Sequence, residues 1–227
     1  ALHYLGNNHT FKTRVLKNKN NLVLKGGGDP DLTINQLDSL AIIVSKYIKK
    51  VDTLYVDDTF LDSLNYGKGW MWDEGPWWYA APISALSVND NCINFYIEPG
   101  DIGSPANINY FPETSYITFE NNSTTVNDTL DYKKFKIDRD WVVNGNNFSV
   151  TGEIIDTTKK DTLYRNIYDP SLFTGTIFRQ LLNEHGTIVK KLSKKTQDLT
   201  VYKEITVHYS DSLIVSAKNL MNESDNL

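Results

Sequence analysis

Residues 21–58 read NLVLKGGGDPDLTINQLDSLAIIVSKYIKKVDTLYVDD, and this stretch decides the fold class. Its two ends are β-prone runs, and its middle carries apolar residues at helical spacing, namely Leu37, Leu40, Ala41, Val44, Tyr47 and Ile48. Thr33 and Gln36 form the capping-box pattern that starts a helix. The stretch therefore predicts a strand, a helix and a second strand, the unit from which α/β layers are built.

Two features within this unit, a run of glycines and a pair of aspartates, could form part of a functional site. Gly26, Gly27 and Gly28 lie where a phosphate loop would be expected, but they match neither the spaced glycines of a dinucleotide site nor the Lys and Ser/Thr of a Walker loop. A tight structural turn is therefore favoured. Asp57 and Asp58 resemble a metal pair, yet neighbouring residues on a strand point to opposite faces. They are assigned to a strand end and a turn.

Working outward, residues 1–5 read as the end of a helix that Gly6 terminates in the left-handed conformation. Residues 11–25 predict a strand pair joined by an Asn-rich turn. Further segments are a β-rich region of short runs, a helix after Pro170 that stops at Gly186, an extended passage and a last helix; they cover residues 100–166, 170–186, 199–210 and 213–221. The expected fold class is α+β (mixed α/β), a strand-helix-strand layer with an inserted small β-rich subdomain.

Composition excludes several function classes. The net charge of -5 comes from mixed charges without a basic patch, which argues against a nucleic acid partner. No apolar run is long enough for a transmembrane helix. The single cysteine, Cys92, and four scattered histidines lack the spacing of metal ligands, so we expect no metal and no cofactor. A secretory leader is not recognisable in the sequence, and we expect that one would have been removed.

The densest stretch is GKGWMWDEGPWWYAAPISALSVNDN, residues 67–91. Four Trp and one Tyr fall within ten of these residues and alternate with carboxylates, Gly and Pro. Aromatic rings beside a carboxylate suit a ligand with an apolar stem and an ammonium group. A hydrophobic minicore under a loop explains the same residues equally well. The chemistry of the stretch alone leaves both readings open.

The last residues before Leu227 are Ser224-Asp225-Asn226, a Ser-x-Asn tripeptide. In the penicillin-recognising serine enzymes, such a motif stands between a Ser-x-x-Lys motif that carries the nucleophile and a Lys-Thr-Gly motif. A Ser or Asp that caps a helix is the alternative explanation, and for an isolated tripeptide it is the better one.

Six segments that occur in a fixed order along the chain favour the catalytic motif over the helix cap. They are ALHYLG with FKTRV, LVLKGGGDPDLT, VDTLYVDDTFLD, residues 67–92, YDPSLFTGTIFRQLLNEHG and SDSLIVSAKNLMNESDNL. Together they closely resemble the class C low-molecular-mass penicillin-binding proteins, the D-alanyl-D-alanine carboxypeptidases of serine peptidase family S13. The resemblance covers most of the chain and is weakest in the β-rich region.

The resemblance implies a domain plan and a set of site residues. Residues 1–10 would end the nucleophile-helix region of a transpeptidase-like domain, to which residues 204–227 return; the inserted α/β domain would comprise residues 11–99 and 167–203, with the β-rich subdomain at 100–166. Ser224 would relay protons and Asn226 would orient the substrate. Trp70, Asp73 and Trp78 match positions that line a pocket for the free amino end of the peptidoglycan stem peptide, although some relatives have Tyr or Phe in place of Trp78.

The same resemblance implies a function for the parent protein. It would be a bacterial serine-type hydrolase of the periplasm or cell envelope, with β-lactams as inhibitors and peptide cross-links as a further substrate. The chain contains neither Ser-x-x-Lys nor Lys-Thr-Gly, so these 227 residues alone are expected to be inactive. The alternative is a non-catalytic peptidoglycan- or glycan-binding module that uses the Trp-rich surface.

Overall fold

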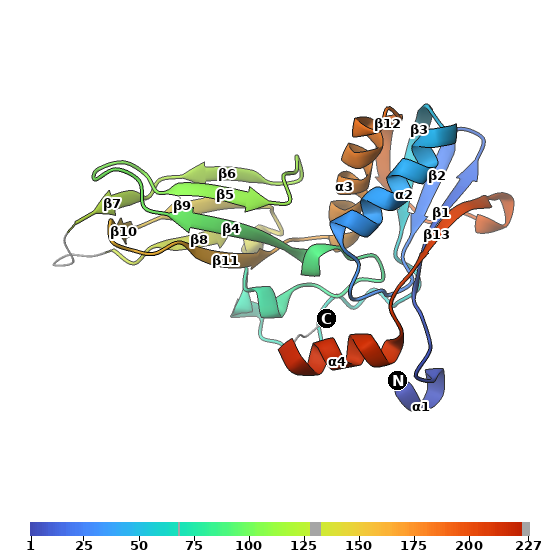
Figure 1. Cartoon of the computed structure of the whole chain (residues 1–227), viewed down its shortest axis with the longest axis horizontal. Helices are drawn as coiled ribbons and strands as arrows, with labels where there is room; N and C mark the ends of the chain where they lie inside the picture. The colour runs from blue at the N-terminus through green and yellow to red at the C-terminus, as the bar shows by residue number, and fades with distance from the viewer. Residues whose placement is uncertain (68, 128–132, 224–227) are drawn as a thin grey trace. The chain divides into compact units, whose positions relative to one another are not determined.

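The computed structural model describes residues 1–67, 69–127 and 133–223 (Figure 1). The chain divides into two compact units. The first unit contains Ala1–Gly69, Pro82–Asn91 and Asp169–Leu227, and the second contains Trp70–Ala81 and Cys92–Tyr168. The described strands form four sheets beside several helices, which confirms the mixed α+β class. The assignment of segments to a transpeptidase-like and an inserted domain stays a prediction.

The first unit is built on a five-stranded sheet of order β12-β3-β2-β1-β13. Its strands are β1 (Lys12–Asn18), β2 (Asn21–Lys25), β3 (Lys50–Asp57), β12 (Ile188–Lys194) and β13 (Lys203–Tyr209). Strands β2, β3 and β12 are parallel to one another, while β1 is antiparallel to both β2 and β13. The predicted strand-helix-strand unit is therefore confirmed as β2-α2-β3. Strand β12 was not predicted.

Helices α2 (Ile34–Tyr47) and α3 (Pro170–Glu184) lie beside each other on one side of this sheet (Figure 1). The predicted capping box is present, since the Thr33 hydroxyl accepts from Gln36 N at 3.3 Å and the Gln36 side chain accepts from Thr33 N at 2.7 Å. The two helices bury apolar residues against the sheet, including Leu37, Val44, Phe173 and Phe178. This layer is the core of the first unit.

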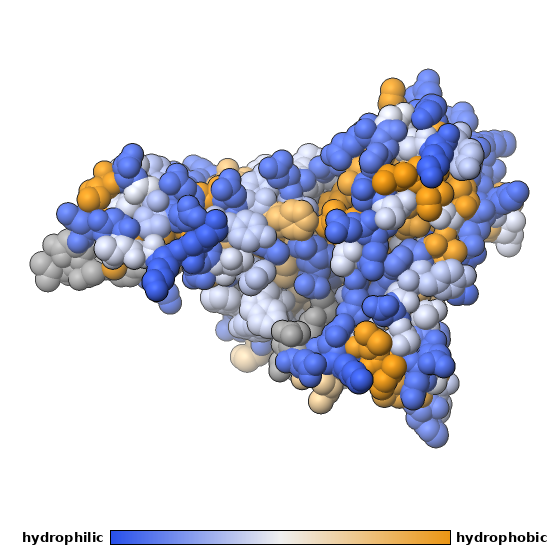
Figure 2. Space-filling model, viewed as in Figure 1, coloured by the Kyte–Doolittle hydropathy of each residue, from blue (hydrophilic) through white to orange (hydrophobic). Residues whose placement is uncertain are grey.

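Two further helices belong to the first unit, α1 (Leu2–Leu5) and α4 (Leu213–Glu223). Gly6 ends α1 with a φ of 82° but a ψ of 159°, so the left-handed conformation predicted there is wrong. Hydrophobic residues are visible at the surface over α4 (Figure 2), where Val215, Leu220 and Met221 are exposed. None of the helices within the described ranges is long and apolar enough to cross a membrane.

The second unit is β-rich. One sheet has the order β11-β4-β5 and a second the order β6-β9-β8, while β7 and β10 form a parallel pair. The strands are β4 (Cys92–Glu98), β5 (Asn107–Phe111), β6 (Thr118–Asn121), β7 (Thr124–Val126), β8 (Lys136–Arg139), β9 (Asn147–Thr151), β10 (Glu153–Ile155) and β11 (Asp161–Asn166). The ring of Phe95 packs against those of Phe119 and Phe148, so aromatic side chains fill the space between strands of the two sheets.

Candidate functional site

The aromatic turn segment, residues 70–81, carries three of the predicted site residues and lies wholly in the second unit. It forms two short 3-10 turns, η1 (Trp72–Glu74) and η2 (Trp78–Ala80), separated by Gly75, Pro76 and Trp77. Asp73 is exposed on η1, and Trp78 at the start of η2 is 44% exposed. Trp70, which precedes η1, is half-buried. The structure therefore places Trp70, Asp73 and Trp78 on one continuous piece of irregular chain.

The aromatic rings of η2 and the residue before it are grouped. The ring planes of Trp77 and Tyr79 are nearly parallel, with an interplanar angle of 6° and centroids 6.3 Å apart. Trp78 meets Tyr79 edge to face at 5.9 Å. Each of the three side chains remains more than one-third exposed. These three rings therefore do not form a buried hydrophobic minicore, which was one of the two alternatives that the sequence allowed. It can offer aromatic surface to a ligand.

Asn166, the last residue of β11, holds the backbone of the aromatic turn segment. Its side-chain amide donates to the carbonyl oxygens of Gly75, Trp77 and Ala80 at 3.0, 2.8 and 2.9 Å. Its backbone N–H donates to Pro76 O at 2.9 Å. Asn166 is buried, and a buried amide with these bonds fixes the turns more firmly than local propensity could. No sequence pattern had drawn attention to this residue.

Arg165, the neighbour of Asn166, lies beneath Trp77. Its guanidinium carbon is 4.5 Å from the centre of the Trp77 ring, within cation–π range. Its Nε donates to Ile137 O at 2.6 Å and its Nη1 to Tyr164 O at 2.8 Å. Burial lowers the pKa of this guanidinium, while the charge of Asp138 opposes that shift. Arg165 thus supports Trp77 from the strand side.

Gly75 is required where it stands. Its φ is +55°, and a Cβ added there would lie 2.9–3.2 Å from atoms of the Trp141 ring. Both the backbone conformation and the close approach of Trp141 therefore exclude a larger residue without movement. The bend between η1 and η2 depends on this position.

The two predicted catalytic residues, Ser224 and Asn226, lie outside the described residues. The structure describes the helix that leads to them, α4, which is fixed at its start by backbone bonds from Leu213 N to His9 O at 2.7 Å and from Ile214 N to Asn7 O at 3.2 Å. Strand β13, which precedes α4, pairs with β1 along its length.

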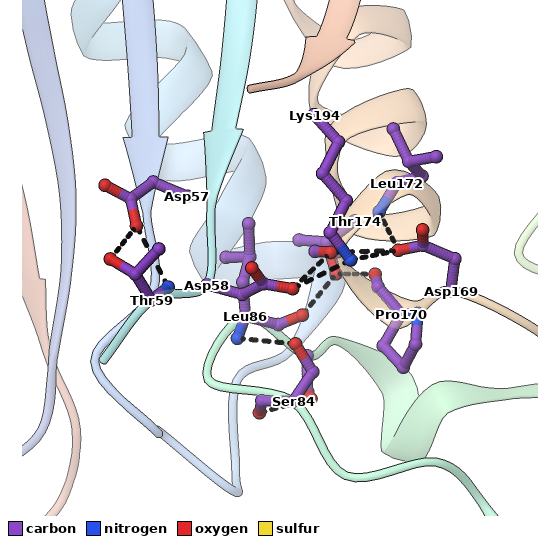
Figure 3. A network of polar contacts seen from close by, with 12 residues as sticks. Asp57, Asp58, Thr59, Ser84, Leu86, Asp169, Pro170, Leu172, Thr174 and Lys194 are labelled. Atoms are coloured by element: carbon purple, nitrogen blue, oxygen red, sulfur yellow. Dashed lines mark hydrogen bonds and ion pairs between the residues drawn. The ribbon is translucent and has the colours of Figure 1, made fainter. Parts of the chain in front are cut away.

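A second polar group lies at the carboxyl ends of β3 and β12 in the first unit (Figure 3). Lys194 Nζ bridges Asp58 at 2.9 Å and Asp169 at 3.0 Å. Burial would lower the pKa of Lys194, but its hydrogen bonds to these carboxylates outweigh burial and raise it. Asp57 instead pairs with Lys25 at 3.0 Å, so the two adjacent aspartates have different partners, as expected at a strand end. Asp58 and Lys194 border a cavity of about 280 Å³.

The glycine turn after β2 is structural, as predicted. A Cβ on Gly26 would lie 2.0 Å from Ala85 O, and one on Gly27 would lie 2.4 Å from Lys12 O. The following Asp29 is buried, which raises the pKa of its carboxyl, and it lies 3.5 Å from His208 Nε2. Within the described residues, no group of three His, Cys, Asp or Glu side chains could hold a metal ion.

Comparison with known proteins identifies the family of the chain. The sequence profile of the D-Ala-D-Ala carboxypeptidase 3 (S13) family matches residues 1–227. A D-alanyl-D-alanine carboxypeptidase from Actinomadura sp. (strain R39) is 29% identical over 206 residues, which cover 84% of this chain and 38% of that protein. The D-alanyl-D-alanine carboxypeptidase DacB of Haemophilus influenzae is 34% identical over 108 residues, covering 40% of this chain and 22% of that protein.

Solved structures share the fold. The crystal structure of penicillin binding protein 4 (dacB) from Haemophilus influenzae matches with a TM-score of 0.80 at 24% identity, covering 99% of this chain and 51% of that one. A second crystal structure of that protein, complexed with a β-lactam, matches with a TM-score of 0.72 at 23% identity, covering 100% of this chain and 50% of that one. This chain spans about half the length of the structures it matches, and less of the curated relatives.

Proposed function

This chain belongs to the D-Ala-D-Ala carboxypeptidase S13 family, and on that premise we propose that it is part of a serine-type D-Ala-D-Ala carboxypeptidase that acts on peptidoglycan stem peptides outside the cytoplasm. The observation that carries the proposal is the match of the family profile over residues 1–227. The exposed carboxylate and aromatic rings of the aromatic turn segment support it, because they suit a peptide with an apolar stem and an amino group.

The chemistry proposed for the parent protein is acyl transfer through a serine. The hydroxyl oxygen of a serine in a Ser-x-x-Lys motif, which this sequence does not contain, attacks the carbonyl carbon of the penultimate D-Ala. The bond to the terminal D-Ala breaks and its nitrogen takes a proton. Water then hydrolyses the acyl-enzyme. Backbone N–H groups hold the oxyanion during both steps.

Five residues of this chain have roles in the proposal. Ser224 relays a proton and Asn226 orients the donor peptide through its amide. Asp73 pairs with the free amino group of the stem, while Trp70 and Trp78 cover its aliphatic part. An ion pair that stays exposed to water contributes little, but if the bound stem shields the pair, a hydrogen bond between charged groups contributes about 1.5–3 kcal/mol. Asp73 alone would then favour an amino-bearing stem about 10- to 150-fold.

Penicillin labelling tests the proposal directly. The protein is expressed from its complete gene without any leader and incubated with benzylpenicillin. Its intact mass is then measured by mass spectrometry. We expect the mass of one drug molecule to be added to a serine outside the present sequence. We also expect Ser224→Ala to slow that acylation at least about 100-fold, because a group that transfers a proton contributes about 10²- to 10⁴-fold. A folded protein that takes up no drug would refute the proposal and favour the binding module built on the Trp-rich surface.

The stem-recognition role needs a separate test. A peptide ending in D-Ala-D-Ala with a free amine on its third residue is compared with the same peptide acetylated on that amine. We expect Asp73→Asn to abolish most of the preference for the free amine. An unchanged preference would remove Asp73 from the proposed site while leaving the acyl-transfer chemistry untouched.

A further inference from the structure

The shape of the aromatic turn segment depends on contacts with β11. The segment contains only three-residue 3-10 turns, and its regular pairing with a strand is one isolated bridge between Trp77 and Arg165. Short turns of this kind do not hold their shape without partners. Side chains from elsewhere in the second unit must therefore fix the direction in which Asp73 and Trp78 point.

Asn166 supplies a direct restraint of this kind. Its amide has two hydrogens, and three carbonyl oxygens lie within 3.0 Å of its nitrogen, so at least one hydrogen is shared between two acceptors. These acceptors, Gly75 O, Trp77 O and Ala80 O, span the bend and the whole of η2. One side chain thus ties together the piece of chain that separates Asp73 from the end of η2.

The orientation of the Asn166 amide is itself determined by its environment. Arg139 Nη2 donates to Asn166 Oδ1 at 3.0 Å, which assigns the oxygen to that side and turns the NH₂ group toward the carbonyls. Arg139 is in turn held by Gly145 O at 2.6 Å. Arg139 and Asn166 are both nearly inaccessible to solvent, so water does not compete for these bonds.

We infer that Asn166 and Arg165, at the end of β11, are positioning residues that set the selectivity of the proposed stem-peptide pocket. The inference rests on the proposed function. Asn166 fixes the backbone between Asp73 and Trp78, and Arg165 holds Trp77 through its ring face. A charge-assisted bond depends on direction, and a displacement of about 1 Å in a positioning element can cost about 100-fold in rate.

The test uses the complete parent protein and the variant Asn166→Asp. This change keeps the size of the side chain but replaces the NH₂ group by a carboxylate oxygen that faces three carbonyl oxygens. We expect the ratio of kcat/KM for the free-amine peptide to kcat/KM for its acetylated form to fall at least about tenfold, mainly through KM, because a displaced Asp73 loses its directed bond to the amine. General destabilisation would lower both values together and leave their ratio unchanged.

Asn107→Asp is the matched control. It makes the same chemical change in the same unit, where the Asn107 amide donates to Pro99 O at 3.2 Å and lies on β5 rather than beside the aromatic turn segment. We expect this variant to keep the wild-type ratio. A wild-type ratio in Asn166→Asp, or an equal fall in both variants, would overturn the inference.

Arg165→Lys is the second variant, and it decides the matter if Asn166→Asp does not fold. Lysine keeps the charge but cannot present a planar face to Trp77, so the ratio should fall several-fold. An unchanged ratio in folded Arg165→Lys would overturn the inference. Penicillin labelling of the same samples separates the two proposals: no adduct on the wild type refutes the enzyme, whereas an adduct with unaltered peptide selectivity in the variants refutes the positioning role alone.

Discussion

Gly26 offers a quantitative test of the packing in the first unit. Its Cβ position is 2.0 Å from Ala85 O, 2.5 Å from Ala85 C and 2.6 Å from Leu86 Cα, all of them backbone atoms. An unstrained carbon–oxygen contact measures at least about 3.3 Å, so Gly26→Ala must push these two segments apart by about 1.3 Å. Side-chain rotation cannot relieve the contact.

The cost follows from three contributions. Overpacking costs about 1–3 kcal/mol, and the bond from Gly28 N to Ala85 O, 2.9 Å long, would be weakened at a cost of about 1 kcal/mol. The reduced entropy of the unfolded chain offsets about 0.4–1 kcal/mol. The net loss is about 1–3.6 kcal/mol, which corresponds to a fall in Tm of about 2–14 °C for a domain of this size.

Thermal unfolding followed by circular dichroism measures this loss, and hydrogen exchange locates it. Gly186→Ala is the control, since nothing lies within 4 Å of its Cβ position and its φ of +82° makes it report the backbone conformation alone. Exchange at Gly28 N–H should accelerate in Gly26→Ala and not in Gly186→Ala. A Tm within about 2 °C of wild type, together with unchanged exchange at Gly28, would refute the reasoning.

Three further changes test other parts of the first unit. Thr33→Ala removes the hydroxyl half of the capping box with Gln36 and should cost about 1 kcal/mol in denaturant unfolding, with Thr33→Ser close to wild type. Phe173→Ala should cost about 3–5 kcal/mol in the same assay, because the ring is fully buried, and a loss under 1 kcal/mol would contradict that packing. Burial would raise the pKa of Asp57, but hydrogen bonds from Thr59 and Lys25 outweigh burial and lower it. Because the pKa of Asp57 is lower in the folded state, its carboxylate stabilises the fold at pH values above the unfolded-state pKa of about 3.9. This stabilisation is lost as the pH falls through the folded-state pKa. Asp57→Asn should therefore destabilise the protein at pH 7, and the deficit should shrink below about pH 4; a deficit independent of pH would exclude this role.

The sequence predicted the elements whose burial repeats at a regular period. Helix α2 has its buried residues at helical spacing and its capping box in view, so both its class and its start were predictable. Strand β12 was missed because it lies at the edge of the sheet and most of its side chains face solvent, with Val189 as its buried residue. Its place is set by hydrogen bonds to β3, which leave no mark on the amino-acid pattern.

The candidate site, like the fold, could be predicted from the sequence only in part. The cluster of Trp and acidic residues in residues 70–81 is evident from the sequence, and the structure exposes Asp73 and Trp78. Asn166 and Arg165 could not be found in this way, because each is a single polar residue whose partners are distant in sequence. A useful signal would have been a polar pair closing a strand, Arg165-Asn166, in a region otherwise made of alternating residues, since buried polar groups need partners.

The pairing of β1 with β13 has a mechanical consequence. Lys12 at the start of β1 lies opposite Tyr209 at the end of β13, and Lys17 lies opposite Lys203. Tension transmitted along the chain from before β1 and after β13 would therefore load the hydrogen bonds of this pair one after another, from the Lys12 end, rather than all together. Strands pulled in this geometry separate one hydrogen bond at a time and at low force. Strands β2, β3 and β12 carry no load until the pair has separated. In a protein stretched between these flanking segments, the backbone bonds that join residues 7–11 to residues 210–214 would open first and the β1–β13 pair next. The chain between the two strands would still be folded at that point.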